Sequence, residues 1–327
     1  MKKVFFKEGY IDSAFLTITT LLKELDIPFT YDYVKNNIIK FSSYPYLNVE
    51  DLSSLLESKF KIRNKVIRLE LDRLSEIILP AIAFLKFEKK CYVVITEIDS
   101  ENVKLRHPYN GDLILTEIDL LSYWTDSLIL IYDYDENFKE RNYLKNKKKQ
   151  DELIDKFKNN HIKLIPNFLN PKECDVLCSE IERESTKLPD YSGNFVVKLD
   201  EISPAIYNKI LAKIIEITRK NKNCIEPPIC IRYSEGKQNS LHYDVLNEDV
   251  GKYLYSFVIY LNDNFKEGET YFPQFDYIVK PVKGCVLMFR NFDEDMKTFD
   301  CSVHAGRPTL MGIKYTCNIW ISTYPIS

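Results

Sequence analysis

The first part of the chain combines a helical and a strand-like spacing of apolar residues. Apolar side chains recur every three or four positions over residues 10–25 and again over residues 52–60, which predicts two helices, the first with Asp12 and Ser13 as its N-cap. Residues 66–71 predict a strand or an edge segment. Further strand-like runs, each bounded by turn residues, cover residues 81–87, 92–98, 103–106, 112–115 and 127–131. Helices followed by antiparallel hairpins predict an α+β domain.

The chain becomes densely charged before its second half. Four lysines stand close together there, namely Lys145, Lys147, Lys148 and Lys149. Such a run indicates a solvated linker or an exposed helix face, and a docking patch for an acidic segment is the alternative. A length of 327 residues with 45% hydrophobic content leaves room for two domains. We therefore expect one domain at residues 1–135 and another at residues 161–327, joined by a charged linker at residues 136–160.

The second half predicts helices and then a series of strands. Asn170 with Glu173 three residues later is typical of a capped helix N-terminus, and Ser203-Pro204 predicts the start of another helix. Residues 188–198 between them predict a loop that faces a substrate. Strand-like runs follow at residues 255–261, 278–282, 285–289 and 315–321. Six of the nine glycines fall between residues 236 and 312, before and among these strands, which indicates a turn-rich β domain.

Three side chains of this β domain have the chemistry of an iron site. His242 and Asp244 are two positions apart, so a strand would direct both to one face. His304 on a neighbouring strand would complete a set of two imidazoles and one carboxylate, which suits Fe(II) and leaves coordination positions open. Two of the four histidines belong to this set. A His-x-Asp pair alone is more often a surface or core feature, so the assignment depends on its surroundings.

An ordered series of short motifs surrounds these residues. It runs through Ile231-Arg232-Tyr233, Leu241-His242-Tyr243-Asp244, Ile259-Tyr260-Leu261-Asn262, Gly268-Glu269-Thr270, Lys283-Gly284, Val303-His304-Ala305-Gly306, Gly312-Ile313-Lys314 and Asn318-Ile319-Trp320. In order and spacing, residues 161–327 resemble the catalytic domain of prolyl 4-hydroxylase-like, Fe(II)- and 2-oxoglutarate-dependent dioxygenases. The resemblance implies a double-stranded β-helix, or jelly roll, with buttressing helices.

The resemblance also implies roles for individual residues. His242, Asp244 and His304 would be the catalytic metal ligands that hold Fe(II). Lys314 would bind the distal carboxylate of the co-substrate 2-oxoglutarate, and dioxygen (O2) would be the oxidant. A carboxylate at position 244 implies hydroxylation rather than halogenation, because halogenating relatives usually have Ala or Gly there.

Other pocket residues follow from the same resemblance. Tyr233 and Tyr260 would donate hydroxyl hydrogens to the co-substrate, with Asn318 nearby, although both tyrosines are equally compatible with a packing role in a strand. Two positions depart from the family pattern, because Glu267 replaces a Gly and Tyr253 stands where an Arg is often found. Both departures concern the mouth of the pocket, so the substrate does not carry over and proline is one candidate.

The first half of the chain resembles a different family. The motifs that carry this resemblance are Asp12-Ser13-Ala14, Leu79-Pro80-Ala81-Ile82-Ala83, Tyr92-Val93-Val94, Pro108 and Gly111. Over residues 5–132 they resemble the papain-like peptidase domain of bacteriocin-exporting ABC transporters, which cleaves leader peptides. Where that family has its nucleophilic Cys, its oxyanion-hole Gln, its His and its Asp, this chain has Ser13, Lys7, Cys91 and His107.

These replacements predict a peptidase fold without peptidase activity. A serine without an aligned histidine base is a poor nucleophile. We expect a degenerate domain that has kept its groove for peptide recognition. His107 is either a structural histidine beside a turn or, in a rearranged site, a partner of Cys91 or Ser13.

Composition narrows the range of partners and locations. A net charge of −3 and a pI near 6.0 give no basic field, so we expect no nucleic-acid partner. The apolar run after Met1-Lys2-Lys3 is too short for a signal peptide, and no run approaches membrane-spanning length. We therefore expect a cytoplasmic protein without a membrane partner, whose eight cysteines are reduced. Nothing in the sequence indicates the oligomeric state.

Three hypotheses of function follow. The first is a hydroxylase of a residue in a peptide or protein, whose N-terminal domain binds a leader or recognition segment and so raises the effective concentration of the target. The second is a hydroxylase of a free amino acid or small metabolite, with a purely structural N-terminal domain. The third is a non-catalytic binding protein with two inactive enzyme folds. Binding of residues 1–135 to a peptide array separates the first two.

Overall fold

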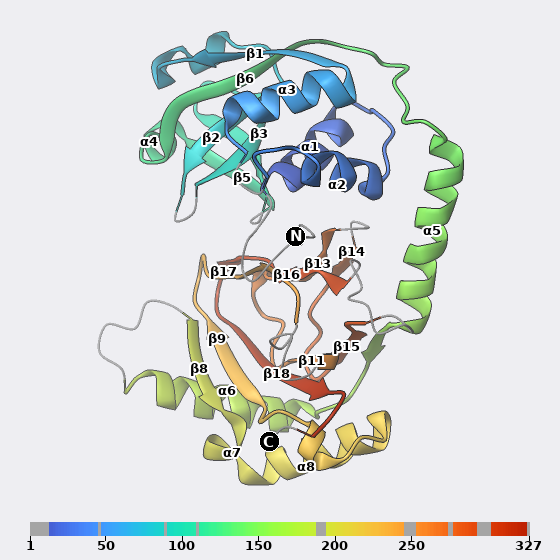
Figure 1. Cartoon of the computed structure of the whole chain (residues 1–327). Helices are drawn as coiled ribbons and strands as arrows, with labels where there is room; N and C mark the ends of the chain where they lie inside the picture. Colours follow the sequence, from blue (N-terminus) through green and yellow to red (C-terminus); the bar gives the residue numbers. More distant parts are fainter. Residues whose placement is uncertain are drawn as a thin grey trace. The chain divides into compact units, whose positions relative to one another are not determined.

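The chain folds into two compact units, Met1–Glu152 and Leu153–Ser327 (Figure 1). The computed structural model describes residues 13–44, 47–87, 90–108, 111–187, 194–244, 253–273, 277–292 and 302–325. The division between the units falls inside the segment predicted as a charged linker. The domain limits given above remain a prediction.

Helices pack on a single antiparallel sheet in the first unit (Figure 1). The helices are α1 (Ser13–Glu24), α2 (Tyr31–Ile39), α3 (Val49–Phe60) and the short α4 (Glu117–Leu121). The strands lie in the spatial order β1 (Ile62–Arg68), β6 (Trp124–Tyr134), β2 (Ala81–Lys86), β3 (Lys90–Ile98), β4 (Asn102–His107) and β5 (Gly111–Thr116). Helix α1 contacts β3, and α3 contacts β1 and β6. This mixed architecture confirms the α+β prediction.

Helix-capping residues and the spacing of apolar residues explain most of these helices and strands, with two exceptions. Asn48 and Asp51 form a reciprocal capping box at the start of α3, as expected for a strong helix N-terminus. The strand predicted at residues 66–71 is misplaced, because β1 ends at Arg68 and Leu71–Glu76 form a 3₁₀-helix. Helix α2 was not predicted, since its short apolar stripe lies in a segment rich in polar residues.

The second unit contains two antiparallel sheets and covering helices. The larger sheet has the order β7 (Ile162–Ile165), β15 (Val286–Arg290), β11 (Tyr253–Tyr260), β18 (Lys314–Ser322), β9 (Ile229–Tyr233) and β8 (Asn194–Lys198). The smaller has the order β10 (Asn239–His242), β16 (His304–Gly306), β13 (Thr270–Phe272) and β14 (Tyr277–Val279). A further ladder joins β12 (Lys266–Glu267) to β17 (Thr309–Met311). Two such sheets confirm the predicted jelly roll.

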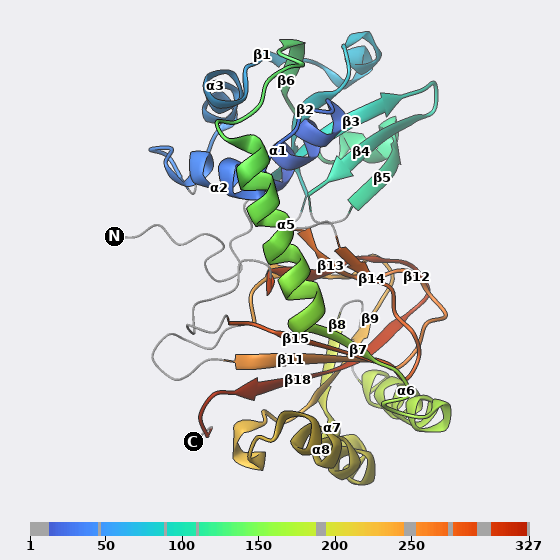
Figure 2. The same cartoon turned by 90° about the vertical axis from the view of Figure 1, so that its right-hand side faces the viewer.

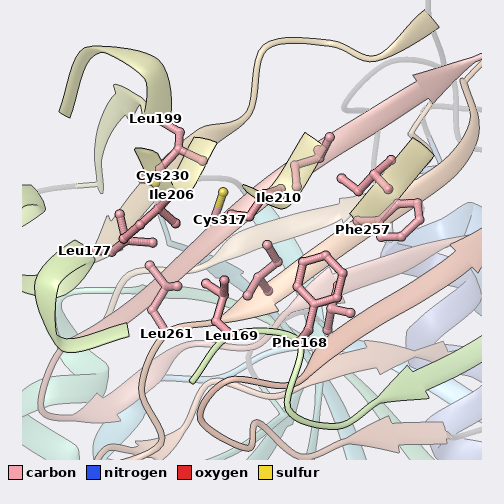
Figure 3. Close-up of a cluster of buried hydrophobic side chains, with 14 of the residues drawn as sticks. Phe168, Leu169, Leu177, Leu199, Ile206, Ile210, Cys230, Phe257, Leu261 and Cys317 are labelled. Carbon is pink, nitrogen blue, oxygen red and sulfur yellow. The ribbon is translucent and has the colours of Figure 1, made fainter. Parts of the chain in front are cut away.

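Helices cover one side of the larger sheet, and the smaller sheet lies on the other side (Figure 2). These helices are α6 (Pro171–Ser185), α7 (Leu199–Ile202) and α8 (Pro204–Thr218). Alternate residues of β11 and β18, such as Phe257 and Cys317, pack against Leu177 and Ile210 in the helix-side core (Figure 3). The intervening residues of the same strands therefore face the smaller sheet.

The predicted substrate loop and the predicted charged linker both contain regular secondary structure. Residues 194–198 of the predicted substrate loop form the edge strand β8, and residues 188–193 lie outside the described residues. The charged segment contains helix α5 (Tyr143–Asn160), which agrees with the exposed helix face among the interpretations above. Lys147 pairs with Asp151 one turn later along this helix. None of the described helices has both the length and the apolar content that crossing a bilayer requires.

Gly284 offers a test of how tightly α6 is joined to the sheet. Its φ is +79°, and an added Cβ would overlap the carbonyl oxygen of Leu169, whereas Gly236 has a φ of +76° and open space around it. Gly284→Ala is expected to lower the free energy of unfolding of the second unit by about 3 kcal/mol, and Gly236→Ala by about 1 kcal/mol, because only the former adds a steric clash to the backbone strain. Denaturant unfolding followed by circular dichroism measures both. Equal losses would contradict this packing account.

Candidate metal centre and co-substrate pocket

The smaller sheet brings three metal-ligating side chains together. Strands β10 and β16 are antiparallel neighbours, and His242 lies directly opposite His304. Asp244 follows β10 by two residues and is buried. One ligand atom from each of the three residues lies within 4.8 Å of the others. The spacing in the sequence therefore becomes a compact set of two imidazoles and one carboxylate.

A hydrogen bond orients the His304 ring of this set. The Nδ1 atom of His304 lies 2.9 Å from the carbonyl oxygen of Ser302. Since a carbonyl only accepts, Nδ1 carries the proton, and Nε2 keeps its lone pair. That Nε2 atom is 3.6 Å from one Asp244 oxygen, and His242 Nε2 is 3.2 Å from the other. Both imidazoles thus converge on the carboxylate.

The protonation states suit a cation. Burial alone would raise the Asp244 pKa, but His304, His242 and a hydrogen bond from Ser256 hold that pKa well below its usual range. Burial, together with the neighbouring His242, lowers the pKa of His304 to about 4. At neutral pH the carboxylate is ionised and the His304 imidazole is neutral, which are the forms that bind metals.

Lys314 forms a second polar centre on the larger sheet. It is 3% exposed, and its Nζ donates to the Gly268 carbonyl over 2.6 Å. The Tyr233 ring, on the paired position of β9, has its centroid 5.0 Å from the same Nζ. Burial lowers the Lys314 pKa to about 8, partly offset by Glu269. Within the described part of the chain no carboxylate pairs directly with this ammonium, so it is suited to pair with an anion from outside.

Tyr260 and Asn318 lie on the same interior face as Lys314. The Tyr260 hydroxyl is fully buried and 2.8 Å from the Thr270 hydroxyl. Burial raises the pKa of both Tyr233 and Tyr260, so the hydroxyls remain protonated. The Oδ1 atom of Asn318 is buried and has no hydrogen-bond partner among the described residues. All four residues predicted to bind the co-substrate thus come from the larger sheet, although their roles remain predictions.

The two departures from the family pattern have local partners. Glu267 has a φ of +63°, a conformation that favours glycine, and its carboxylate pairs with Arg307 over 2.8 Å. Arg307 also reaches Glu269 over 3.4 Å. The Tyr253 hydroxyl donates to Glu226 over 3.1 Å, and its ring stacks on Trp320 with the centroids 5.9 Å apart. Neither departure disturbs the three ligands.

Sequence reasoning missed residues that support the ligands. Asn291 donates to the Ser256 hydroxyl over 2.8 Å, and Ser256 is among the groups that lower the pKa of Asp244. Ser256 had a detectable signal, since it is a small polar residue within an apolar strand. Ser302 had none, because it orients His304 through its backbone carbonyl.

Two of the altered peptidase positions meet in the first unit. The Cys91 sulfur lies 3.4 Å from His107 Nε2, and both side chains are buried. Burial raises the Cys91 pKa to about 12 and lowers the His107 pKa to about 4. Both groups are therefore neutral at pH 7, unlike an activated thiolate. Ser13 begins α1, and Lys7 lies outside the described residues.

Comparison with known proteins gives a different family match for each half of the chain. A family model described as the 2OG-Fe(II) oxygenase superfamily matches residues 229–322, and one described as the Peptidase C39 family matches residues 3–136. The two halves are similar to two different families. These matches confirm both resemblances drawn from the sequence and, for the C-terminal domain, the expected enzyme class of 2-oxoglutarate-dependent oxygenases.

Individual relatives match parts of the chain. Prolyl 4-hydroxylase 2 of Arabidopsis thaliana is 26% identical over 196 residues, which cover 47% of this chain and 64% of that protein. The viral collagen prolyl hydroxylase of Paramecium bursaria Chlorella virus 1 is 25% identical, with a TM-score of 0.44, over 51% of this chain and 98% of that one. A double glycine motif protease from an AMS/PCAT transporter, solved with a leader peptide, is 15% identical, with a TM-score of 0.32, over 39% of this chain and 89% of that one. The matches span 29% to 69% of the length of the curated relatives.

The buried Lys314 predicts an unusual dependence of stability on pH. Its pKa is about 8 in the fold, below the ordinary value of 10.5, so the unfolded chain binds more protons between these two values. The free energy of unfolding of the second unit should therefore rise as the pH increases from about 8 to about 10.5. Lys314→Met should stabilise the unliganded protein at pH 7 by on the order of 1–3 kcal/mol and abolish that rise. Denaturant unfolding at several pH values measures this, and an unchanged slope in the variant would place the titrating group elsewhere.

Proposed function

We propose that this chain is an Fe(II)- and 2-oxoglutarate-dependent hydroxylase of a residue in a peptide or protein, and that its N-terminal domain binds a leader or recognition segment of that substrate. The observation that carries the reaction class is the pair of buried polar centres in one domain. His242, Asp244 and His304 form a ligand set, and Lys314 is a buried ammonium without a direct carboxylate partner in the described part of the chain.

The donor set fits Fe(II). Two imidazole nitrogens and one carboxylate on one face suit this ion and leave positions for a chelating co-substrate. Fe(II) with 2-oxoglutarate and O2 supplies the oxidising chemistry, in which the co-substrate loses carbon dioxide and becomes succinate, one oxygen atom enters succinate and the other becomes a hydroxyl group on the substrate.

The protein's own residues bind, orient and exclude water. Lys314 would hold the distal carboxylate of 2-oxoglutarate through a charged hydrogen bond, which contributes on the order of 1.5–3 kcal/mol. The Tyr233 ring lies beside its Nζ and would shield this contact from solvent. Phe289 packs edge-on against His304, with the ring centroids 4.6 Å apart, and keeps the inner side of the site apolar. Tyr260 and Asn318 would complete the polar wall.

The N-terminal domain supports a peptide substrate. The domain keeps the sequence motifs of the peptidase fold, although its four catalytic positions are changed. Binding a peptide requires the fold but not the catalytic residues. The protease to which it is similar was solved with a leader peptide, and relatives of the C-terminal half are named prolyl 4-hydroxylases. A peptide carrying a proline is therefore the first substrate class to test. Tethering by one domain would raise the concentration of the target residue at the other.

Loss of any metal ligand should abolish the reaction. His242→Ala, Asp244→Ala and His304→Ala are each expected to weaken Fe(II) binding at least about 100-fold and to remove 2-oxoglutarate turnover, because each takes away one of three protein ligands. Anaerobic metal titration and succinate release measure the two effects. His107→Ala, at a buried histidine outside the site, is the matched control and should bind metal normally. Succinate formation that survived two ligand substitutions would contradict the iron assignment.

The N-terminal domain should bind peptides without cutting them. We expect no cleavage of any leader peptide, and removal of residues 1–135 should raise the KM for a full-length peptide substrate at least about tenfold with little change in kcat. Oxidation of 2-oxoglutarate without substrate serves as the control for an intact oxygenase domain. A truncated chain that modified its peptide as efficiently as the whole chain would leave the N-terminal domain only a structural role.

A further inference from the structure

We infer that Gly306 determines which co-substrate the pocket accepts, because its missing side chain leaves room beside Lys314 for a carboxylate. The inference rests on the proposed function and adds to it a specificity-determining residue. That residue would select a 2-oxoacid with a second, distal carboxylate. The family resemblance assigned no role to this glycine.

Gly306 lies on the strand that carries the metal ligand His304. It is the last residue of β16 and pairs with Asn239 of β10 on one side and with Thr270 of β13 on the other. His304 stands two residues earlier in the same strand, so both positions face the same side of the sheet. A side chain at position 306 would therefore stand next to a metal ligand, on the face that carries it.

The structure has room for a methyl group at this position, directly beside the ammonium. An added Cβ would lie 3.5 Å from Lys314 Nζ, 3.5 Å from the Asn239 Cβ and 3.7 Å from the Asn239 backbone nitrogen. These are ordinary van der Waals distances, so no described side chain occupies the place of that Cβ. A lysine ammonium has three N–H donors, and the Gly268 carbonyl accepts one of them. A carboxylate in this space can accept another.

The backbone does not require glycine at position 306. Its φ lies outside the left-handed region, unlike that of Gly268, where φ is +73° and an added Cβ would lie 2.9 Å from the Phe265 ring. A glycine in a paired strand weakens it relative to alanine, and such glycines often mark the close approach of a ligand. Since neither φ nor crowding explains Gly306, we attribute it to the ligand.

Asn239 connects this space to the metal ligands. Its Nδ2 lies 3.4 Å from His242 Nε2, and the same Nε2 is 3.2 Å from Asp244. The wall that Asn239 forms thus reaches from the proposed metal to the space beside Lys314. A 2-oxoacid that chelates the metal would extend along this wall, and only one with a distal carboxylate would reach the ammonium. Alanine at position 306 would place a methyl group where that carboxylate has to lie.

Anaerobic binding of two 2-oxoacids to the Fe(II)-loaded full chain tests the inference without turnover. Gly306→Ala is expected to weaken the binding of 2-oxoglutarate about 10- to 100-fold, the equivalent of one charged hydrogen bond, and to leave that of 2-oxobutyrate within about threefold of wild type. The same variant should unfold at an unchanged or higher urea concentration, because alanine restricts the unfolded chain and meets no clash. Gly236→Ala is the matched control, since it strains the backbone outside the pocket and should leave both affinities unchanged.

Three results would overturn the inference. Unchanged 2-oxoglutarate affinity in Gly306→Ala would show that the space is not used. An equal loss for both acids would indicate a general disturbance of the site, and failure of the variant to fold would show that no methyl group fits there. In each case, a wild type that still prefers 2-oxoglutarate to 2-oxobutyrate leaves the proposed function standing. A wild type that binds both acids equally would overturn the proposed function and the inference together.

Discussion

The interior of the C-terminal jelly roll contains two buried charged groups, the Asp244 carboxylate and the Lys314 ammonium. The buried Asp244 carboxylate has His242 Nε2 at 3.2 Å and His304 Nε2 at 3.6 Å, whereas the Lys314 ammonium has a backbone carbonyl and an aromatic face beside it. Burial of an ion without a counter-ion costs several kcal/mol. The packing of the surrounding sheets has to offset this cost.

The period of the β-strands makes this interior possible. Along β18, Cys317 and Ile319 pack into the helix-side core, while Lys314 and Asn318 face the smaller sheet. One strand therefore supplies both the hydrophobic core and the polar wall. Truncating a helix-side residue of β18 would also displace Lys314 and Asn318, because the packing of that residue fixes the position of the strand backbone that carries them.

Much of this arrangement was predictable from the sequence, and the remainder depended on contacts between distant segments. The two-residue spacing of His242 and Asp244 identified a shared face, and the apolar alternation identified most strands. Helix α2 and the strand β8 gave no clear signal, since the former has a short apolar stripe and the latter is an edge strand beside polar residues. The hydrogen bond from Asn291 to Ser256 was hidden, because it joins a residue after β15 to one in the middle of β11.

We propose that one domain binds a metal at His242, Asp244 and His304 and the distal carboxylate of 2-oxoglutarate at Lys314. The most direct test of this proposal compares the affinity of the Fe(II)-loaded chain for 2-oxoglutarate with its affinity for 2-oxobutyrate, which lacks that carboxylate, in wild type and Lys314→Met under anaerobic conditions. The account predicts that wild type prefers 2-oxoglutarate by roughly 10- to 100-fold, the equivalent of one charged hydrogen bond, and that the variant loses this preference. A variant that still discriminates between the two acids as strongly as wild type would contradict it.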